Sequence, residues 1–457
     1  MVPSVFTSLA YLTLAGFARA ATVTYNFNAT WVWASPDGVG RPVIGINGEW
    51  PCPTIKATTG DIVVVNLYNG LGNQTTGLHF HGVNQIMTSD MDGPSGVTQC
   101  PLPPGSSMKY QFVVDSPGTF WYHSHNMGQY PDGLRGPMIV SDPNDPYKGQ
   151  YDEEYVLTVS DWYHNDSITL MKSMLSPSNT NFLPAFPDSI LVNEGKGARV
   201  NFVKGKTYRI RMINFSAFAS ALIHFDSHTM SVISNDAAYI QKQEAYQLRL
   251  TPAQRYDVLI SCIDRDNGNF PFLISLDINR DWTDPNAQLR WGLNYTGYLV
   301  MDSSPLTKLD VVDKWNPADD AHFKPYNNAP AYPSYDHLIH LDFEFCFDQN
   351  GYPRACFNNV TYIEQKVPTL YSAATTGQFN TKPHHLRPTG RATGPAATST
   401  TQQPADARHV AVMAHSYAVL RFKADNPGVW LFHCHIEWHV EMGLTATIIE
   451  APDRLRG

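Results

Sequence analysis

A stretch near residue 120 recurs near residue 430, and this internal repeat constrains the fold more than any other feature of the chain. The first copy reads Asp-Ser-Pro-Gly from Asp115, then four residues, then His-Ser-His at 123–125. The second copy reads Asp-Asn-Pro-Gly from Asp425, then four residues, then His-Cys-His at 433–435. Two domains of one fold explain such a repeat, and a chain of 457 residues leaves room for a third domain between them.

Short apolar runs that alternate with polar residues dominate the chain and predict β-strands. Residues 62–65 and 108–114 are examples, and turn residues separate the runs, with 33 Pro and 31 Gly in all. This pattern favours an all-β protein built from sandwiches. We place domain boundaries near residues 145 and 305, which gives domains at 21–145, 146–305 and 306–457. The stretch from about 381 to 408 is rich in Thr, Ala, Pro, Gly and Gln, lacks periodicity and predicts a disordered insert.

The N-terminus predicts export from the cell. An apolar run from Val5 to Phe17 precedes Ala-Arg-Ala at 18–20, so we expect residues 1–20 to be a signal peptide. No apolar stretch of membrane-spanning length follows, and we expect a protein that is secreted or held at the cell surface. The net charge of −9 argues against a nucleic-acid partner. Six glycosylation sequons support the extracellular route; they begin at Asn28, Asn73, Asn165, Asn214, Asn294 and Asn359.

The six cysteines do not all have the same expected role. Cys346 and Cys356 flank an Asn-Gly turn at 350–351 and could close a hairpin by a disulfide, whereas other pairings stay open. Cys434 lies between two histidines. We expect its sulfur to bind a metal as a thiolate, which makes it unavailable for a disulfide.

Three His-x-His units carry the clearest chemical signal. In a strand, residues i and i+2 share a face, so each unit directs two imidazoles to one point. Imidazole clusters suit copper, zinc, iron or nickel. Zinc is the main alternative to copper, although structural zinc sites prefer ligand sets that are rich in cysteine. Ordinary surface histidines are the other alternative. The expected metal ligands are His79, His81, His123, His125, His433, Cys434, His435 and His439.

The strand around Cys434 could serve two metal sites. Because side chains alternate along a strand, His433 and His435 point one way and Cys434 the other. His439 follows on the next turn or loop, where it could join Cys434. A cysteine thiolate with histidines is the blue-copper electron-transfer set. We therefore expect His433, Cys434 and His435 to take part in catalysis directly.

These blocks resemble those of the multicopper oxidases, the family of laccases, ascorbate oxidases and fungal ferroxidases. His-Phe-His-Gly at 79–82 resembles the first family motif, Trp-Tyr-His-Ser-His at 121–125 the second, and HCHIEWHVEMGL at 433–444 the fourth. The resemblance covers nearly the whole mature chain. It implies three cupredoxin-like (Greek-key β-sandwich) domains and up to four copper ions in type 1, type 2 and type 3 centres. It also implies four one-electron oxidations coupled to the reduction of O₂ to water.

The resemblance further implies a place for each ligand. Leu444 falls at the axial position of the type 1 copper, where it cannot coordinate and is expected to raise the copper potential. By this resemblance, His79 binds the type 2 copper, and Cys434 and His439 bind the type 1 copper. One type 3 copper is bound by His81, His123 and His435, and the other by His125 and His433.

One family motif is missing. The third motif has the form H-P-x-H-L-H-G-H and supplies one histidine to each copper type, and no such run occurs in this sequence. Adjacent His384 and His385 echo it, but they would point to opposite faces of a strand. His409 and His415 are also available, without motif context. We expect an incomplete third domain that lacks roughly fifty residues and leaves sheet edges exposed. Either an error in the gene model or a true loss of function would explain the missing residues.

Within the family the chain resembles the fungal ferroxidases of iron uptake. Met-Asp-Gly at 91–93 and Ser-Asp-Trp-Tyr-His at 160–164 carry this likeness. It implies Fe²⁺ as reductant, O₂ as oxidant and an iron permease as partner. Asp161 stands where ferroxidases have an iron-binding acid, and Asp277 and Asp281 are candidates for a second; an ordinary surface carboxylate is the alternative for each. A laccase-like phenol oxidase and a non-catalytic copper-binding remnant are the alternative functions.

Overall fold

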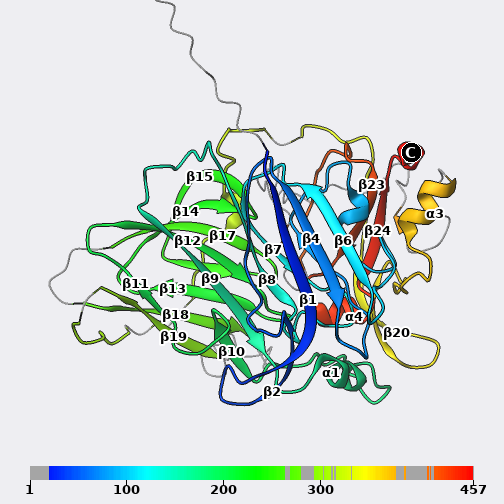
Figure 1. The fold of residues 1–457 in the computed structure, drawn as a ribbon, viewed down its shortest axis with the longest axis horizontal. Coiled ribbons are helices and arrows are strands. Elements are labelled where there is room, and N and C mark those ends of the chain that lie inside the picture. The colour runs from blue at the N-terminus through cyan, green and yellow to red at the C-terminus, as the bar shows by residue number, and fades with distance from the viewer. Residues whose placement is uncertain are drawn as a thin grey trace, which may run out of the picture.

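The computed structural model describes residues 20–262, 268–278, 293–301, 303–309, 312, 315–330, 332–376, 385–386, 409–410, 412 and 416–455, and for 385–386 it describes the backbone alone. Strands dominate these residues, which confirms the expected all-β fold (Figure 1). The sheets follow the chain in three groups, drawn from blue to cyan, in green, and from yellow to red.

Two four-stranded sheets make up the first group. Their strand orders are β2-β1-β4-β6 and β3-β8-β7-β5, so β7 lies inside its sheet with a neighbour on each side. A short 3₁₀ helix, η1 (Ser89–Met91), lies between β5 and β6. The strands are β1 (Thr22–Ala34), β2 (Arg41–Ile46), β3 (Ile55–Thr58), β4 (Ile62–Asn69), β5 (His79–His81), β6 (Ser107–Val113), β7 (Gly118–His123) and β8 (Arg135–Ser141).

A six-stranded and a five-stranded sheet make up the second group. Their orders are β10-β9-β12-β17-β14-β15 and β11-β19-β18-β13-β16. The helix α1 (Ser167–Met174) follows β9 and begins where the Asp166 carboxylate accepts a hydrogen bond from Thr169 N. The strands are β9 (Glu153–Trp162), β10 (Ser189–Val192), β11 (Arg199–Asn201), β12 (Thr207–Asn214), β13 (Ser220–Phe225), β14 (Met230–Asn235), β15 (Ala238–Ala245), β16 (Gln247–Leu250), β17 (Arg255–Ser261), β18 (Phe270–Asp277) and β19 (Asn294–Val300).

The third group is smaller. It holds a two-stranded hairpin and a three-stranded sheet of order β22-β24-β23, in which β23 has no described strand on its second side. The strands are β20 (Phe343–Phe347), β21 (Pro353–Phe357), β22 (His385–Leu386), β23 (Gly428–His433) and β24 (Thr445–Glu450). The helices are η2 (Asp320–His322), α3 (Thr369–Thr376), α4 (Glu437–Glu441) and η3 (Pro452–Arg454).

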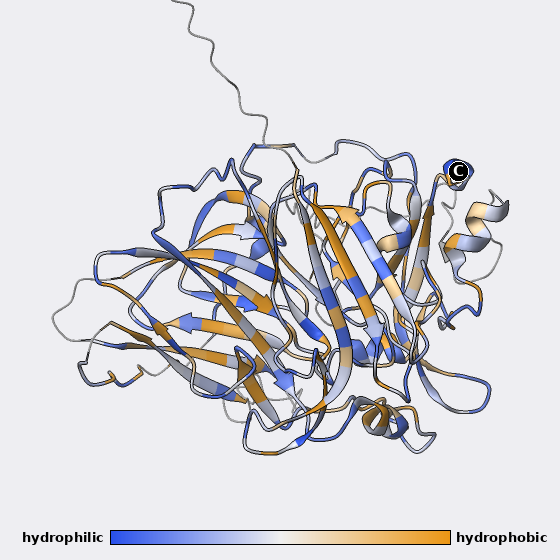
Figure 2. Ribbon diagram, in the orientation of Figure 1, coloured by the Kyte–Doolittle hydropathy of each residue, from blue (hydrophilic) through white to orange (hydrophobic). Residues whose placement is uncertain are grey.

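Alternating side chains explain how the strands build their cores. In β4, Val63, Val65 and Leu67 are fully buried, while Tyr68 is exposed. Figure 2 shows the corresponding bands of hydrophobic and hydrophilic residues along the strands. Each fully buried aliphatic side chain of this kind contributes roughly 1.5–3 kcal/mol through the hydrophobic effect.

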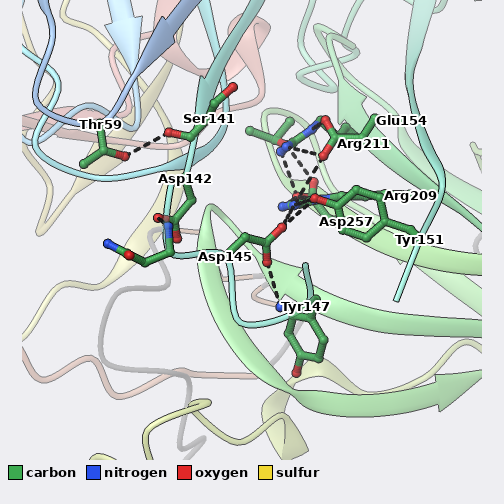
Figure 3. A network of polar contacts seen from close by, with 12 residues as sticks. Thr59, Ser141, Asp142, Asp145, Tyr147, Tyr151, Glu154, Arg209, Arg211 and Asp257 are labelled. Atoms are coloured by element: carbon green, nitrogen blue, oxygen red, sulfur yellow. Dashed lines mark hydrogen bonds and ion pairs between the residues drawn. The ribbon is translucent and has the colours of Figure 1, made fainter. Parts of the chain in front are cut away.

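A buried network of charged groups joins the first group of sheets to the second (Figure 3). Arg209 contacts Asp145 at 2.9 Å, in the segment that connects the two groups. Arg211 contacts Asp257 at 3.1 Å, and the Thr119 hydroxyl donates to the same carboxylate at 2.6 Å. Because Thr119 belongs to β7, the network holds that strand against β12 and β17. Removal of one partner from such a buried ion pair typically costs about 3–5 kcal/mol.

The expected disulfide, and the absence of one at Cys434, are confirmed. Cys346 and Cys356 form a disulfide across the β20–β21 hairpin. Cys434 is a free cysteine. The internal repeat is confirmed as well, because β7 and β23 both begin at the glycine of Pro-Gly and end at the first histidine.

Two other expectations concern export. Asn214 is fully buried, and its side-chain amide donates to Ala219 O and Leu250 O. This sequon therefore cannot carry a sugar in the folded protein, which corrects one of the six expected glycosylation sites. No helix in the described ranges is long and apolar enough to cross a membrane. Apart from the backbone of β22, the expected insert at 381–408 lies outside the described residues.

Candidate metal centre

Neighbouring strands bring the first two His-x-His units together. β5 pairs with β7 in antiparallel register, with His79 opposite His123 and His81 opposite Trp121. The rings of His79 and His123 are 5.3 Å apart between centroids, and those of His79 and His125 are 5.5 Å apart. The sequence produces this arrangement because residues two apart on a strand share a face.

The third unit faces the first two across the boundary between the first and third groups of sheets. The rings of His125 and His433 lie 4.9 Å apart, and so do those of His81 and His435. Six imidazoles from three strand ends thus converge on one region, in which His81 and His123 are buried and the other rings are partly buried. We call them the histidine cluster: His79, His81, His123, His125, His433 and His435.

Hydrogen bonds to main-chain carbonyls orient three rings of the cluster. The Nδ1 atoms of His79, His123 and His433 lie 2.8, 2.9 and 2.7 Å from the carbonyl oxygens of Asp92, Ser124 and Cys434. A carbonyl only accepts, so each Nδ1 carries the hydrogen and each Nε2 keeps a lone pair. This is the arrangement that orients a histidine for binding a metal.

The cluster fits copper by its donors and by its unsatisfied atoms. Both ring nitrogens of His435 are buried and have no hydrogen-bond partner. Donor nitrogens of His79, His81 and His123 lie within 4.8 Å of one another, as do those of His81, His435 and His409. Buried nitrogen atoms without partners are costly unless an ion or a hydrogen-bond donor meets them, and copper is well suited to imidazole ligands.

Burial keeps most of these rings neutral, as metal ligands must be. Burial and neighbouring imidazoles hold the pKa of His81, His123, His125 and His435 well below its usual value. Burial lowers the pKa of His433 to about 4. For His79, burial also acts to lower the pKa, but the nearby Asp92 carboxylate outweighs it and the pKa is raised.

Cys434 and His439 lie on the other side of β23. The Cys434 Sγ atom is 3.5 Å from His439 Nδ1, and Ile436 N donates to the sulfur at 3.4 Å. Burial raises the pKa of the Cys434 thiol to about 11 and lowers that of His439 to about 4. Leu444 is buried, and its carbonyl accepts a hydrogen bond from Cys434 N at 3.2 Å. Among the described residues, no further His, Cys, Asp or Glu completes a group of three potential ligands with this pair.

Asp161 lies inside the protein and not at its surface. It is 1% exposed, and its carboxylate accepts hydrogen bonds from the main-chain nitrogens of residues 217, 218 and 219. The Tyr163 hydroxyl also donates to it and in turn accepts from Trp438 Nε1 in α4. Asp161 is therefore not placed to bind iron from solvent, which corrects the expectation from the sequence. It instead supports the helix that carries His439.

The other candidates from the sequence have different outcomes. The Asp277 carboxylate forms an ion pair with Arg249 at 2.9 Å. Asp281, His384, His415 and the side chain of His385 lie outside the described residues. His409, which no motif singled out, lies in the histidine cluster, with its Nε2 3.0 Å from His81 Nε2.

Two carboxylates that hold ligands were not predicted. Asp92 contacts His79 through both its carbonyl and its carboxylate, the latter at 3.4 Å from Nδ1. Asp236 contacts His409 Nδ1 at 3.0 Å. The Met-Asp-Gly run at 91–93 was a usable signal for Asp92. No local pattern marks Asp236, because its partner is 173 residues away.

Comparison with known families agrees with this geometry. Three models described as multicopper oxidase match the chain, over residues 28–145, 153–295 and 375–454. The iron transport multicopper oxidase fetC of Epichloe festucae is 43% identical over 95% of this chain and 77% of its own length. Its aligned region spans 483 positions, more than the 457 residues of this chain, so part of the relative has no counterpart here. The iron transport multicopper oxidase FET3 of Saccharomyces cerevisiae is 35% identical over 95% of this chain and 76% of its own length.

Solved structures show the same likeness. Fet3p, described as a multicopper oxidase that functions in iron import, superposes with a TM-score of 0.84 at 34% identity, over 94% of this chain and 91% of its own. The laccase from Botrytis aclada superposes with a TM-score of 0.78 at 26% identity, over 96% and 89%. With its strand order, its converging histidines and its Cys434–His439 pair, this chain belongs to the multicopper oxidase family and is similar to the fungal members of iron transport.

Proposed function

We propose that this chain is a copper-dependent oxidase whose reductant is Fe²⁺ and whose oxidant is O₂. The observation that carries the proposal is the convergence of the histidine cluster on one side of β23, with Cys434 and His439 on the other. Copper bound there would supply one-electron redox chemistry and couple four single oxidations to the reduction of O₂ to water. Iron as substrate is supported by relatives whose names refer to iron transport.

The protein supplies orientation and neutral ligands for this chemistry. Main-chain carbonyls fix three rings so that each Nδ1 holds the hydrogen and each Nε2 keeps a lone pair, and burial lowers the pKa of most of the imidazoles so that they stay neutral. Cys434 lies between His433 and His435 in the chain, so the thiol site and the cluster share one strand end. Copper ions bound at the thiol and in the cluster would therefore be held by residues that are adjacent in the chain.

The surface beside His439 favours a second candidate, a phenol oxidase. The rings of Phe343 and Phe345 lie 5.9 and 5.2 Å from the His439 ring, and both side chains are exposed. Aromatic groups would pack against a phenol and offer no ligand to Fe²⁺. Measuring kcat/KM for Fe²⁺ and for a bulky phenol on one preparation separates the two candidates: preference for Fe²⁺ supports the proposal, and preference for the phenol replaces it.

Among the described residues, the thiol site has two potential copper ligands. Only Cys434 and His439 are paired there in the described part of the chain, whereas a blue copper site uses two histidines with the cysteine. We therefore expect no blue absorption band and little oxidase activity, which makes a non-catalytic copper-binding protein the third candidate. Full copper loading with turnover of O₂ would contradict this expectation. Sequencing the transcript across residues 381–408 tests whether a third histidine motif belongs there.

We also propose a site of action at the cell surface or outside the cell, with an iron permease as partner. The expected signal peptide and the names of the relatives support this. Fractionation of cells that express the full chain tests the location, and recovery only inside the cell would contradict it. Co-purification with a permease from detergent-treated membranes tests the partner.

A further inference from the structure

His409 lies in the space beside His81 that the missing third motif would be expected to supply with histidines. Its ring stacks on that of His81 at 4.7 Å between centroids and lies 5.8 Å from that of His435. We propose that His409 is a copper ligand of the histidine cluster, and that Asp236 holds its ring in the orientation needed for binding. This concerns copper and not the reductant, so it stands whether iron or a phenol is oxidised.

The hydrogen bonds of His409 leave its outer nitrogen free to bind a metal. The Asp236 carboxylate lies 3.0 Å from His409 Nδ1 and also accepts from His409 N at 2.9 Å. Asp236 is 2% exposed and is paired with Arg255 at 3.0 Å, so it is a carboxylate that only accepts hydrogen bonds. Arg255 Nη1 also lies near His409 Nδ1, at 3.3 Å, but the Asp236 carboxylate is closer and can only accept. Nδ1 therefore carries the hydrogen, and Nε2 presents a lone pair toward His81. Carboxylate, imidazole and metal in this order are a common arrangement in metalloproteins.

The position of His81 between two lone pairs also indicates a cation. His81 Nε2 faces His409 Nε2 at 3.0 Å, and His81 Nδ1 faces His123 Nε2 at 3.4 Å. The Nε2 atoms of His409 and His123 are both acceptors, because in each of these rings the hydrogen is on Nδ1. A neutral His81 has one N–H and can satisfy only one of them. In the other of these two contacts, two nitrogen lone pairs face each other and repel. A metal ion bound between the two nitrogens would remove this repulsion.

The distances suit ligands of one ion. Two imidazole nitrogens bound at about 2.0–2.1 Å with a right angle between them lie about 2.9 Å apart. The 3.0 Å between His81 Nε2 and His409 Nε2 is close to this value, and a His435 nitrogen lies within 4.8 Å of both. The three rings come from β5, from the end of β23 and from the segment that begins at residue 409.

Asp236 brings the second group of sheets into the metal site. It lies in the turn between β14 and β15, and its neighbour Ala237 would be 2.5 Å from a Cβ atom placed on Gly118, at the start of β7. The turn therefore packs closely against the strand that carries His123. This contact fixes the distance between Asp236 and the cluster, so the carboxylate is rigidly placed for holding His409.

Copper binding by variants of the full chain tests the proposal. Cu⁺ affinity is measured by competition with a chelator and copper per chain by atomic spectrometry, for the wild type, His409→Ala, Asp236→Asn and the control His340→Ala, whose side chain is 80% exposed. We expect His409→Ala to weaken the cluster by at least about 100-fold and Asp236→Asn by about 10–100-fold. The control should match the wild type. Equal affinity and copper content in His409→Ala and the control would overturn the proposal.

A measurement without mutation covers the case in which a variant does not fold. In wild-type protein labelled with ¹⁵N-histidine, Cu⁺ should shift the Nε2 resonance of His409 together with that of His81. A shift at His81 with none at His409 would overturn the proposal. The outcome is separate from that of the proposed function. Turnover without a shift at His409 contradicts only this inference, and a shift without turnover supports this inference together with the non-catalytic copper-binding protein.

Discussion

The two strands of the internal repeat, β7 and β23, have the same sequence pattern but different surroundings. Both pair antiparallel with the next strand, β8 or β24, and each of those pairs in parallel with an earlier strand, β3 or β22. β7 has β5 on its second side, whereas β23 has no described strand there. Every residue of β7 is buried, but the last four of β23 are only partly buried. Among the described residues of the third group, no strand corresponds to β5, which carries the first histidine motif in the first group.

The preceding strand shows the same contrast. Phe112 in β6 is 2% exposed and packs on Phe80 at 4.6 Å between ring centroids. Phe422, at the equivalent position of the repeat, is 59% exposed, and no strand is formed there. In the described part of the chain, β23 therefore forms with β24 alone beside it, whereas β7 has a strand on each side.

The largest effect should come from supplying the missing strand. Replacing residues 377–408 with the corresponding segment of a family member that carries H-P-x-H-L-H-G-H should create a blue absorption band, because a second histidine would then join Cys434 and His439. The unchanged chain should show none. Absorption spectra of both copper-loaded proteins check this, with Cys434→Ser in the chimera as a control that removes the band. A blue band in the unchanged chain would break the comparison.

Matched substitutions at Phe112 and Phe422 should differ strongly in stability. Phe112→Ala removes a buried ring and should cost about 3–5 kcal/mol. Phe422→Ala changes an exposed ring and should stay within about 0.5 kcal/mol. Urea unfolding followed by tryptophan fluorescence measures both. A large loss from Phe422→Ala would mean that a further part of the chain covers this side chain in solution.

The two sides of β23 should also differ in how copper affinity depends on pH. Because the pKa of Cys434 is raised to about 11, Cu⁺ must displace a proton from the thiol, and affinity should rise about tenfold per pH unit from 7.5 to 9.5. Most cluster histidines are already neutral there, since burial lowers their pKa, so cluster affinity should stay nearly flat. Chelator competition in the wild type and in Cys434→Ala separates the two sites. A flat response of the thiol site would show that the thiolate already exists without metal.

Features that depend on neighbouring residues were predictable from the sequence, and those that depend on distant contacts were not. The His-x-His units and the Pro-Gly starts of β7 and β23 follow from strand alternation and from turns. The burial of Asp161 could not be predicted in this way. The last six residues of β9 are all buried, so strand alternation does not show which side chains face the solvent. The position of His409 could not be predicted either, because the Asp236 side chain that contacts it belongs to the second group of sheets, 173 residues earlier in the chain.

In the part of the chain that the structure describes, β23 has no strand on its second side, and such an edge makes the yield of soluble protein depend on protein concentration. A strand edge with unpaired backbone groups is a template for a strand of another molecule. Such an encounter is bimolecular, so doubling the concentration speeds it about fourfold, while folding of the single chain keeps its rate. Dilute expression and rapid removal from the producing cell therefore favour the monomer, and storage at high concentration favours chains joined edge to edge.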